Sequence, residues 1–256
     1  MTLFLRLFGT LYHLKPRQAA YQVIRRFGPP PKLPDITGSV SLHENVTLMT
    51  APLRRHMTGS ENCFSFLNAQ QRFDPDNFDW SPPDVGKLWR YNLHYFDCLQ
   101  EENLSFRNKV FLVEDWISKV PKGAEDAWEP FPVSLRIVNW IKWFLSPESG
   151  KEPKTSWLES LHSQVMWLEK NIEYHLLANH LFKNGKALLF AGLYFEGMDA
   201  DRWLCKGLDI VLPELDEQIL SDGGHFERSP MYHSMILEDG LDILSMLGGP
   251  DAGIFE

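Results

Sequence analysis

Four stretches of the chain combine aromatic side chains with amide, imidazole and guanidinium groups more densely than a hydrophobic core requires. They run over residues 89–97, 128–140, 173–184 and 222–233. Aromatic rings stack on the C–H faces of sugars, while the polar groups between them form hydrogen bonds with hydroxyls and carboxylates. These stretches therefore favour a carbohydrate ligand, although any single aromatic residue is more commonly buried between helices.

The overall charge argues against one large class of partner. The chain of 256 residues carries 25 Lys and Arg against 34 Asp and Glu, a net charge of -9, with +6 of it in residues 1–34 and -15 beyond. Because binding to a phosphate backbone needs a basic face, a general nucleic-acid binder is disfavoured. Hydrophobic residues make up 44% of the chain, which is enough for a globular core. The three cysteines are far apart and are expected to be free thiols.

Helices must position the four stretches. Apolar residues recur at spacings of three and four from 155 to 170, which predicts an amphipathic helix. The same spacing predicts helices at 88–101, 107–120, 133–146, 175–196, 202–220 and 230–247. Ser229 and Pro230 suit the start of the last helix, and Gly248 suits its end. Short connections indicate antiparallel hairpins, which could stack as a solenoid, a bundle or a toroid.

The N-terminal third is organised differently. Residues 1–34 predict a basic helical arm and a proline-rich linker, and residues 35–87 predict an irregular lead-in. Its short apolar pieces at 40–42 and 46–49 indicate small strands or irregular structure. A helical domain then occupies 88–256. The apolar start of the chain lacks the features of a signal peptide, so we expect a cytoplasmic location. No apolar run is long enough to span a membrane, although the basic arm could lie on an anionic membrane surface.

Several of these motifs together resemble the N-terminal domain of the heparinase II/III-like polysaccharide lyases. They are Asn179-His180 on a predicted helix, Gly-Gly-His-Phe-Glu-Arg-Ser-Pro-Met-Tyr-His at 223–233, Trp-Arg-Tyr-Asn-Leu-His-Tyr-Phe at 89–96 and Trp-Glu-Pro-Phe-Pro-Val-Ser-Leu-Arg at 128–136. The resemblance implies an all-α fold, an incomplete (α/α) toroid. Its cleft would bind an acidic polysaccharide and cleave it by β-elimination at a uronic acid.

The resemblance also implies a C-terminal β-sandwich that closes the cleft and supplies a further catalytic histidine. Since Glu256 follows soon after the last predicted helix, we expect this sandwich to be absent. A β-sandwich partner or self-association would then cover the exposed apolar surface, and the chain alone would be weakly active or inactive. The family's exported lyases make a periplasmic location the alternative to the cytoplasm.

β-Elimination removes a proton beside a carboxylate, so the charge of that carboxylate must be neutralised first. Asn179 and His180 can donate hydrogen bonds to it, and Arg228 can add a fixed charge. Tyr232 would abstract the proton or donate one to the leaving oxygen; the positive end of its helix favours a phenolate. These four are the predicted catalytic residues. The predicted substrate-binding residues are Tyr91, Asn92, His94, Tyr95, Arg136, Trp140 and His225.

Other interpretations stay open from the sequence. The domain could bind or scaffold an acidic glycan without cleaving it, or it could be a glycoside hydrolase that uses carboxylates such as Glu129, Asp222 and Glu227. Lys183 and Lys186 share one helical face, which is expected to be solvated and to bind substrate only weakly. No metal site or cofactor is predicted, because the candidate ligands lack a tight spacing. Those candidates are His175, His225, Glu227 and His233.

Overall fold

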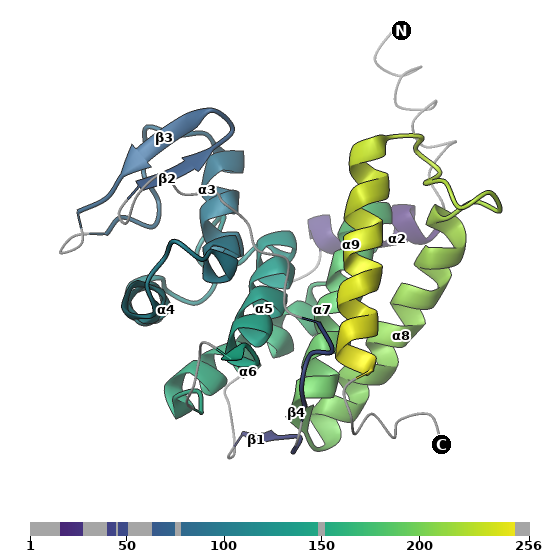
Figure 1. Ribbon diagram of the computed structural model, residues 1–256. Helices are drawn as coiled ribbons and strands as arrows, with labels where there is room; N and C mark the ends of the chain where they lie inside the picture. The colour runs from purple at the N-terminus through teal and green to yellow at the C-terminus, as the bar shows by residue number, and fades with distance from the viewer. Residues whose placement is uncertain are drawn as a thin grey trace, which may run out of the picture.

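The computed structural model describes residues 16–27, 40–44, 46–50, 63–74, 78–147 and 152–248. Helices dominate this part of the chain, and its strands form two small two-stranded sheets (Figure 1). The expected all-α fold is confirmed. Within the described residues, no helix is both long and apolar enough to cross a membrane.

The predicted helices are present with small shifts at their ends. They are α3 (Lys87–Tyr95), α4 (Phe106–Lys119), α5 (Pro130–Phe144), α6 (Thr155–Lys170), α7 (Ala178–Tyr194), α8 (Met198–Gln218) and α9 (Pro230–Leu247). The helix predicted for 88–101 is interrupted, because Phe96 has a φ of 60° and separates α3 from a short 3-10 helix, η1 (Asp97–Gln100). For α9, Ser229 is the N-cap residue, Pro230 is in the first turn and Gly248 is the C-cap, as the sequence indicated.

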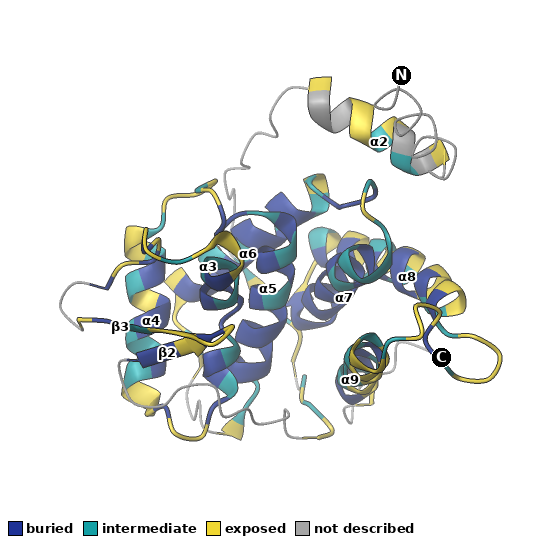
Figure 2. Cartoon of the chain, turned by 90° about the horizontal axis from the view of Figure 1, so that it is seen from above, coloured by how far each residue is buried: buried dark blue, intermediate teal, exposed yellow. Residues whose placement is uncertain are grey.

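Alternate helices form two layers of an incomplete toroid. Contacts join α3 to α5, α5 to α7 and α7 to α9, so these four helices make one continuous layer (Figures 1 and 2). The helices α6 and α8 pack on this layer, and α4 packs on α6 and, through Trp116, on Trp140 of α5. Four tryptophans fill the core with almost no exposed surface, namely Trp116, Trp140, Trp143 and Trp203. Large aromatic side chains therefore hold the layers together, since each buries a large apolar area.

The most extensive helix contact joins α7 and α8, and glycine makes it possible. A Cβ on Gly192 would lie 2.5 Å from the backbone nitrogen of Leu204, and one on Gly207 would lie 2.6 Å from that of Leu189. Neither distance is tolerated between real atoms, so only glycine permits this approach. The contact fixes α7, which carries Asn179 and His180 in its first turn.

The N-terminal third contributes short elements. In α2 (Pro16–Phe27), Tyr21 packs on Tyr174 with ring centroids 4.7 Å apart, while residues 28–34 of the predicted linker lie outside the described residues. At 40–42 the structure has the small strand, β1 (Ser41–Leu42), which pairs antiparallel with β4 (Phe195–Glu196). An unpredicted hairpin joins β2 (Cys63–Phe66) and β3 (Ala69–Arg72).

Of the two alternatives for residues 46–49, a small strand or irregular structure, the structure has the irregular one. The segment has no strand pairing in the structure and instead approaches the end of α9. The backbone N–H of Met49 donates to the Ser245 carbonyl at 3.0 Å, and that of Thr50 donates to the Ser245 hydroxyl at 3.0 Å. Its apolar residues pack on the helical core rather than forming a sheet of their own, as Val46 and Leu48 show.

Candidate active site

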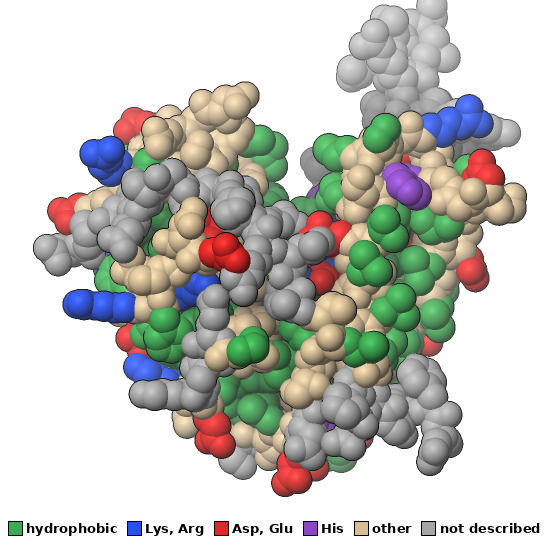
Figure 3. Space-filling model, in the orientation of Figure 1, with side chains coloured by type: hydrophobic (Ala, Val, Ile, Leu, Met, Phe, Trp, Pro, Cys, Tyr) green, Lys and Arg blue, Asp and Glu red, His purple; other side chains and the backbone are tan. Residues whose placement is uncertain are grey.

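A groove runs along the layer formed by α3, α5, α7 and α9. It encloses about 1370 Å³, including space open to solvent, and its lining comes from α3, α5, α7 and α9. Asn92 and Tyr95 of α3, predicted as binding residues, line this groove. Figure 3 shows this side of the molecule, with acidic side chains near the centre and apolar side chains gathered along α9. The exposed apolar residues of α9 include Leu237, Leu241 and Leu244.

A smaller cavity lies next to the groove and contains two predicted catalytic residues. Asn179 of α7 and Tyr232 of α9 both line this cavity, whose volume is about 220 Å³ including space open to solvent. It adjoins the groove because Lys183, Met235 and Asp239 line both. Thus an amide donor and a phenol from two different helices line one cavity beside the groove.

His180 lies one residue further along α7, between a carboxylate and an aromatic ring. Its Nδ1 is 3.3 Å from Oε2 of Glu173, and its ring centroid is 4.4 Å from that of Phe131, a groove residue. The side chain is 35% exposed. The imidazole is therefore fixed on one side and open to solvent on another.

Tyr232 is supported by His225 from the wall of the cavity. The two rings stack with centroids 5.8 Å apart, and His225 is buried. Nδ1 of His225 accepts a hydrogen bond from the backbone N–H of Glu227, so its Nε2 donates to Oε1 of Gln218; both distances are 3.3 Å. Both ring nitrogens are occupied, which suits a role in placing Tyr232 better than the predicted direct contact with substrate.

Arg228 is not brought to this cavity. It is an exposed residue with a φ of 53° in the turn before α9, where its backbone N–H donates to the carbonyl of His225 at 2.9 Å. The described residues that line the cavity include Asn179 and Tyr232 but not Arg228. Its predicted charge neutralisation has no geometric support.

Three predicted binding residues lie in the core instead of the groove. His94 is 2% exposed, and its Nδ1 accepts a hydrogen bond from the Trp116 indole at 3.3 Å; burial lowers the pKa of His94 to about 3, with Arg136 and Arg90 acting in the same direction. Arg136 and Trp140 have no exposed surface. Arg136 and Trp140 are four residues apart on the side of α5 that faces the core. Phe131, Val138 and Lys142 lie on the side that lines the groove. The sequence identifies the stretch 128–140, but it does not show which of its side chains face the groove.

The guanidinium of Arg136 has a clear structural task. It donates to Oε1 of Gln164 at 2.7 Å and to the carbonyls of His94 and Ala127 at 3.1 and 3.0 Å, and it stacks 4.2 Å above the ring of Trp116. These contacts join α5 to α6 and to the end of α3. Arg136 therefore stabilises the helical layers.

Tyr91, predicted as a binding residue, forms a hydrogen bond with the start of α5. Its hydroxyl donates a short hydrogen bond to the carboxylate of Glu129, which also pairs with Lys87 at 2.6 Å. Burial, followed by the hydrogen bond to Glu129, raises the pKa of Tyr91 above its ordinary value. Among the carboxylates considered for a hydrolase, Glu129 is thus engaged at the start of α5, and Asp222 accepts from the backbone N–H of Gly224 in an exposed turn.

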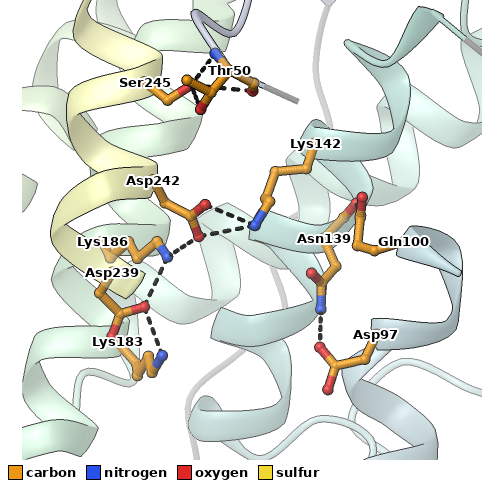
Figure 4. Close-up of polar contacts among 10 residues, drawn as sticks. All are labelled: Thr50, Asp97, Gln100, Asn139, Lys142, Lys183, Lys186, Asp239, Asp242 and Ser245. Atoms are coloured by element: carbon orange, nitrogen blue, oxygen red, sulfur yellow. Dashed lines mark hydrogen bonds and ion pairs between the residues drawn. The ribbon is translucent and has the colours of Figure 1, made fainter. Parts of the chain in front are cut away.

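The sequence missed a buried network of charges across the groove (Figure 4). Asp242 accepts from Lys142 at 2.8 Å and from Lys186 at 2.5 Å, while Asp239 accepts from Lys186 at 2.8 Å and from Lys183 at 2.7 Å. The network joins α5, α7 and α9. Lys186 is 3% exposed, so the predicted solvated lysine face is wrong. Within the described residues, no group of three or more His, Cys, Asp or Glu side chains is arranged to hold a metal ion.

The family of the chain follows from a comparison with known proteins. Residues 78–251 match the family model described as Heparinase II/III N-terminus. The chain belongs to this family. The match includes all seven helices from α3 to α9 and the groove between them.

Three curated relatives of this heparinase II/III chain are named heparin-sulfate lyase. The protein from Pedobacter heparinus is 31% identical over 157 residues, which is 57% of this chain and 23% of the relative. The protein from Bacteroides thetaiotaomicron is 26% identical over 188 residues, which is 66% of this chain and 27% of the relative. The chain thus spans about a quarter of the length of these relatives. The helical domain is that of a polysaccharide lyase family.

Solved structures agree on the fold. The crystal structure of heparan sulfate lyase HepC from Pedobacter heparinus has a TM-score of 0.56 and 24% identity, and it covers 75% of this chain and 33% of that one. A structure titled Heparinase III has a TM-score of 0.55 and 21% identity, and it covers 93% of this chain and 40% of that one. The incomplete helical toroid is therefore the heparinase fold in its N-terminal part.

Proposed function

We propose that this chain binds an acidic, uronate-containing polysaccharide in the groove and cleaves it by β-elimination at the cavity of Asn179 and Tyr232. The observation that carries the proposal is that these two residues, from α7 and α9, line one cavity beside a groove built from four helices. Family membership and the names of the curated relatives support the same class of reaction.

The chemistry assigns a separate task to each side chain. The amide N–H of Asn179 and the protonated imidazole of His180 donate hydrogen bonds to the uronate carboxylate, which makes the C5 proton easier to remove. The C5–H and C4–O bonds break, a C4=C5 double bond forms, and the leaving oxygen takes up a proton. The hydroxyl of Tyr232 is the group in the cavity that can carry a proton to or from the substrate. Lys183 lines both the cavity and the groove, where its ammonium pairs with Asp239 at 2.7 Å.

The test measures unsaturated uronate by its ultraviolet absorbance, with heparan sulfate and a panel of other polyuronates as substrates. We expect the chain to produce this absorbance, and Tyr232→Phe to lower the rate about 10²- to 10⁴-fold, the usual contribution of a positioned acid or base. Tyr194→Phe is the matched control, because Tyr194 is a buried tyrosine at the end of α7 away from the cavity. It should keep its rate.

The other candidate functions give different outcomes in the same assay. New reducing ends without absorbance would indicate a hydrolase, and retention on the polymer without any product would indicate a binding domain. The resemblance also leads us to propose a β-sandwich partner or self-association. Sedimentation of the chain alone and with a sandwich domain added would measure this, and a monomer with full activity would contradict it.

A further inference from the structure

The loop between α6 and α7 holds an acidic side chain in an unusually restrained position. Glu173 is 5% exposed. Its backbone N–H donates to Oδ1 of Asn184 at 2.8 Å, and its Oε2 accepts from Nδ2 of the same amide at 3.2 Å. Asn184 is itself buried and also donates to the hydroxyl of Ser134 at 2.9 Å. The carboxylate is therefore fixed from α7 and α5 before any ligand arrives.

Among the described residues, the basic side chain in contact with this carboxylate is the imidazole of His180. Nδ1 of His180 lies 3.3 Å from Oε2 of Glu173, and no described Lys or Arg side chain forms an ion pair with Glu173. An ionised carboxylate needs donors when it is taken out of water. The Asn184 amide supplies one donor, and a hydrogen on Nδ1 of His180 supplies the other.

The orientation of the ring follows from this contact. When Nδ1–H donates to Glu173, Nε2 points away from the carboxylate, on the side where His180 is exposed beside the groove residue Phe131. Nε2 is then an acceptor in the neutral ring and a donor in the protonated ring. A carboxylate behind an imidazole fixes its tautomer and stabilises its charged form in many catalytic and metal sites.

We infer that Glu173 is a positioning residue for His180, which it holds in the Nδ1–H tautomer with Nε2 presented to the substrate. The part of this inference that concerns catalysis rests on the proposed lyase function. The part that concerns the tautomer does not, because it is a property of the free chain.

The first experiment reads the tautomer directly. Long-range ¹H–¹⁵N NMR of the imidazoles at neutral to mildly alkaline pH distinguishes a protonated ring nitrogen from a bare one, and the signals of His180 are assigned by their loss in His180→Gln. We expect a protonated Nδ1 and a bare Nε2 in the native chain. Glu173→Leu should shift His180 toward the Nε2–H form that free histidine prefers.

The controls separate positioning from folding. Glu101→Gln removes another buried carboxylate, after η1, and should leave the His180 signals unchanged. If Glu173→Leu does not fold, Glu173→Gln keeps the size of the side chain and its bonds to Asn184, and should still lose the charge that favours Nδ1–H. A native His180 in the Nε2–H form, or a tautomer unaffected by both Glu173 variants, would overturn the inference.

The second experiment uses the lyase assay. Glu173→Gln should lower kcat about 10- to 100-fold, as loss of a supporting partner commonly does, with a much smaller change in KM. A loss in KM alone would refute a positioning role. If the chain shows no lyase activity while the NMR result holds, the proposed function fails and the role of Glu173 in orienting His180 stands.

Discussion

Replacing Asp239 by Asn tests whether the buried charge network holds α9 in place. Asp239 is 3% exposed, and its Oδ1 accepts from Lys183 and Lys186 at 2.7 and 2.8 Å. Burial alone would raise the pKa of Asp239, but the charges and hydrogen bonds of Lys186 and Lys183 hold it below its ordinary value. The variant keeps the shape of the side chain and removes only its charge.

The expected loss is large because the buried ammonium of Lys186 and the partly buried one of Lys183 lose a shared partner. Breaking a buried ion pair by removing one member costs about 3–5 kcal/mol. For a domain of this size about 1 kcal/mol shifts the midpoint of thermal unfolding by ~2–4 °C, so a decrease of ~6–20 °C is expected in calorimetry or circular dichroism. The matched control is Glu114→Gln, which breaks the exposed pair with Lys154 and should cost about 0–1 kcal/mol.

The dependence on pH gives an independent check. Because the pKa of Asp239 is lower in the folded chain than in the unfolded chain, its stabilising effect is present above the unfolded pKa and is lost as the pH falls through the folded pKa. The difference in stability between native chain and Asp239→Asn should therefore shrink in acid. A variant no less stable than Glu114→Gln at neutral pH, or a difference that grows in acid, would refute the reasoning.

Further predictions concern the helix contacts, a core histidine and the thiols. Gly192→Ala should destabilise the chain by about 1–3 kcal/mol in urea unfolding, because its Cβ would meet Leu204, whereas Gly240→Ala in α9 meets nothing within 4 Å and should be neutral or stabilising. His94 has its pKa lowered from 6.5 to about 3, so the unfolded chain takes up its proton first and stability falls as the pH drops below 6.5. The advantage of the native chain over His94→Phe should thus shrink by about 2 kcal/mol between pH 7 and pH 5. A thiol reagent should label the exposed Cys205 in the native chain and the two buried cysteines only after unfolding; rapid labelling of all three would contradict the described core.

The sequence predicted the helices better than it predicted the direction of their side chains. A spacing of three and four residues depends only on local geometry, so the helices at 155–170 and 230–247 were found with correct ends. The inward side of α5 depends on which helices pack on it, and Arg136 and Trp140 were therefore assigned to the wrong side. In a helix that is apolar nearly all round, spacing leaves the two sides equivalent.

The charge network escaped prediction for a related reason. Lys142, Lys186 and Asp242 are ordinary surface residues when each helix is considered alone, and their pairing exists only because α5, α7 and α9 meet. By contrast, Asn179 and Tyr232 belong to motifs that resemble those of a known family, and this resemblance is what predicted that they share one site. The spacing of apolar residues predicts helices, but it does not predict which side chains of different helices form ion pairs.

Stability and the proposed chemistry are joined in α9. This helix carries Tyr232 in its first turn and the two aspartates of the network two to three turns later, while its outward side, with Leu237 and Leu241, has no cover in the described part of the chain. Lys183 lies one turn after Asn179 on α7 and bonds to Asp239. The ion pairs that anchor α9 to α7 therefore also set the separation between the phenol and the amide across the cavity. A site assembled from two helices can be no more rigid than the contacts that join them, and here those contacts include the ion pairs of Asp239 beside the buried apolar residues Ile236 and Ile243.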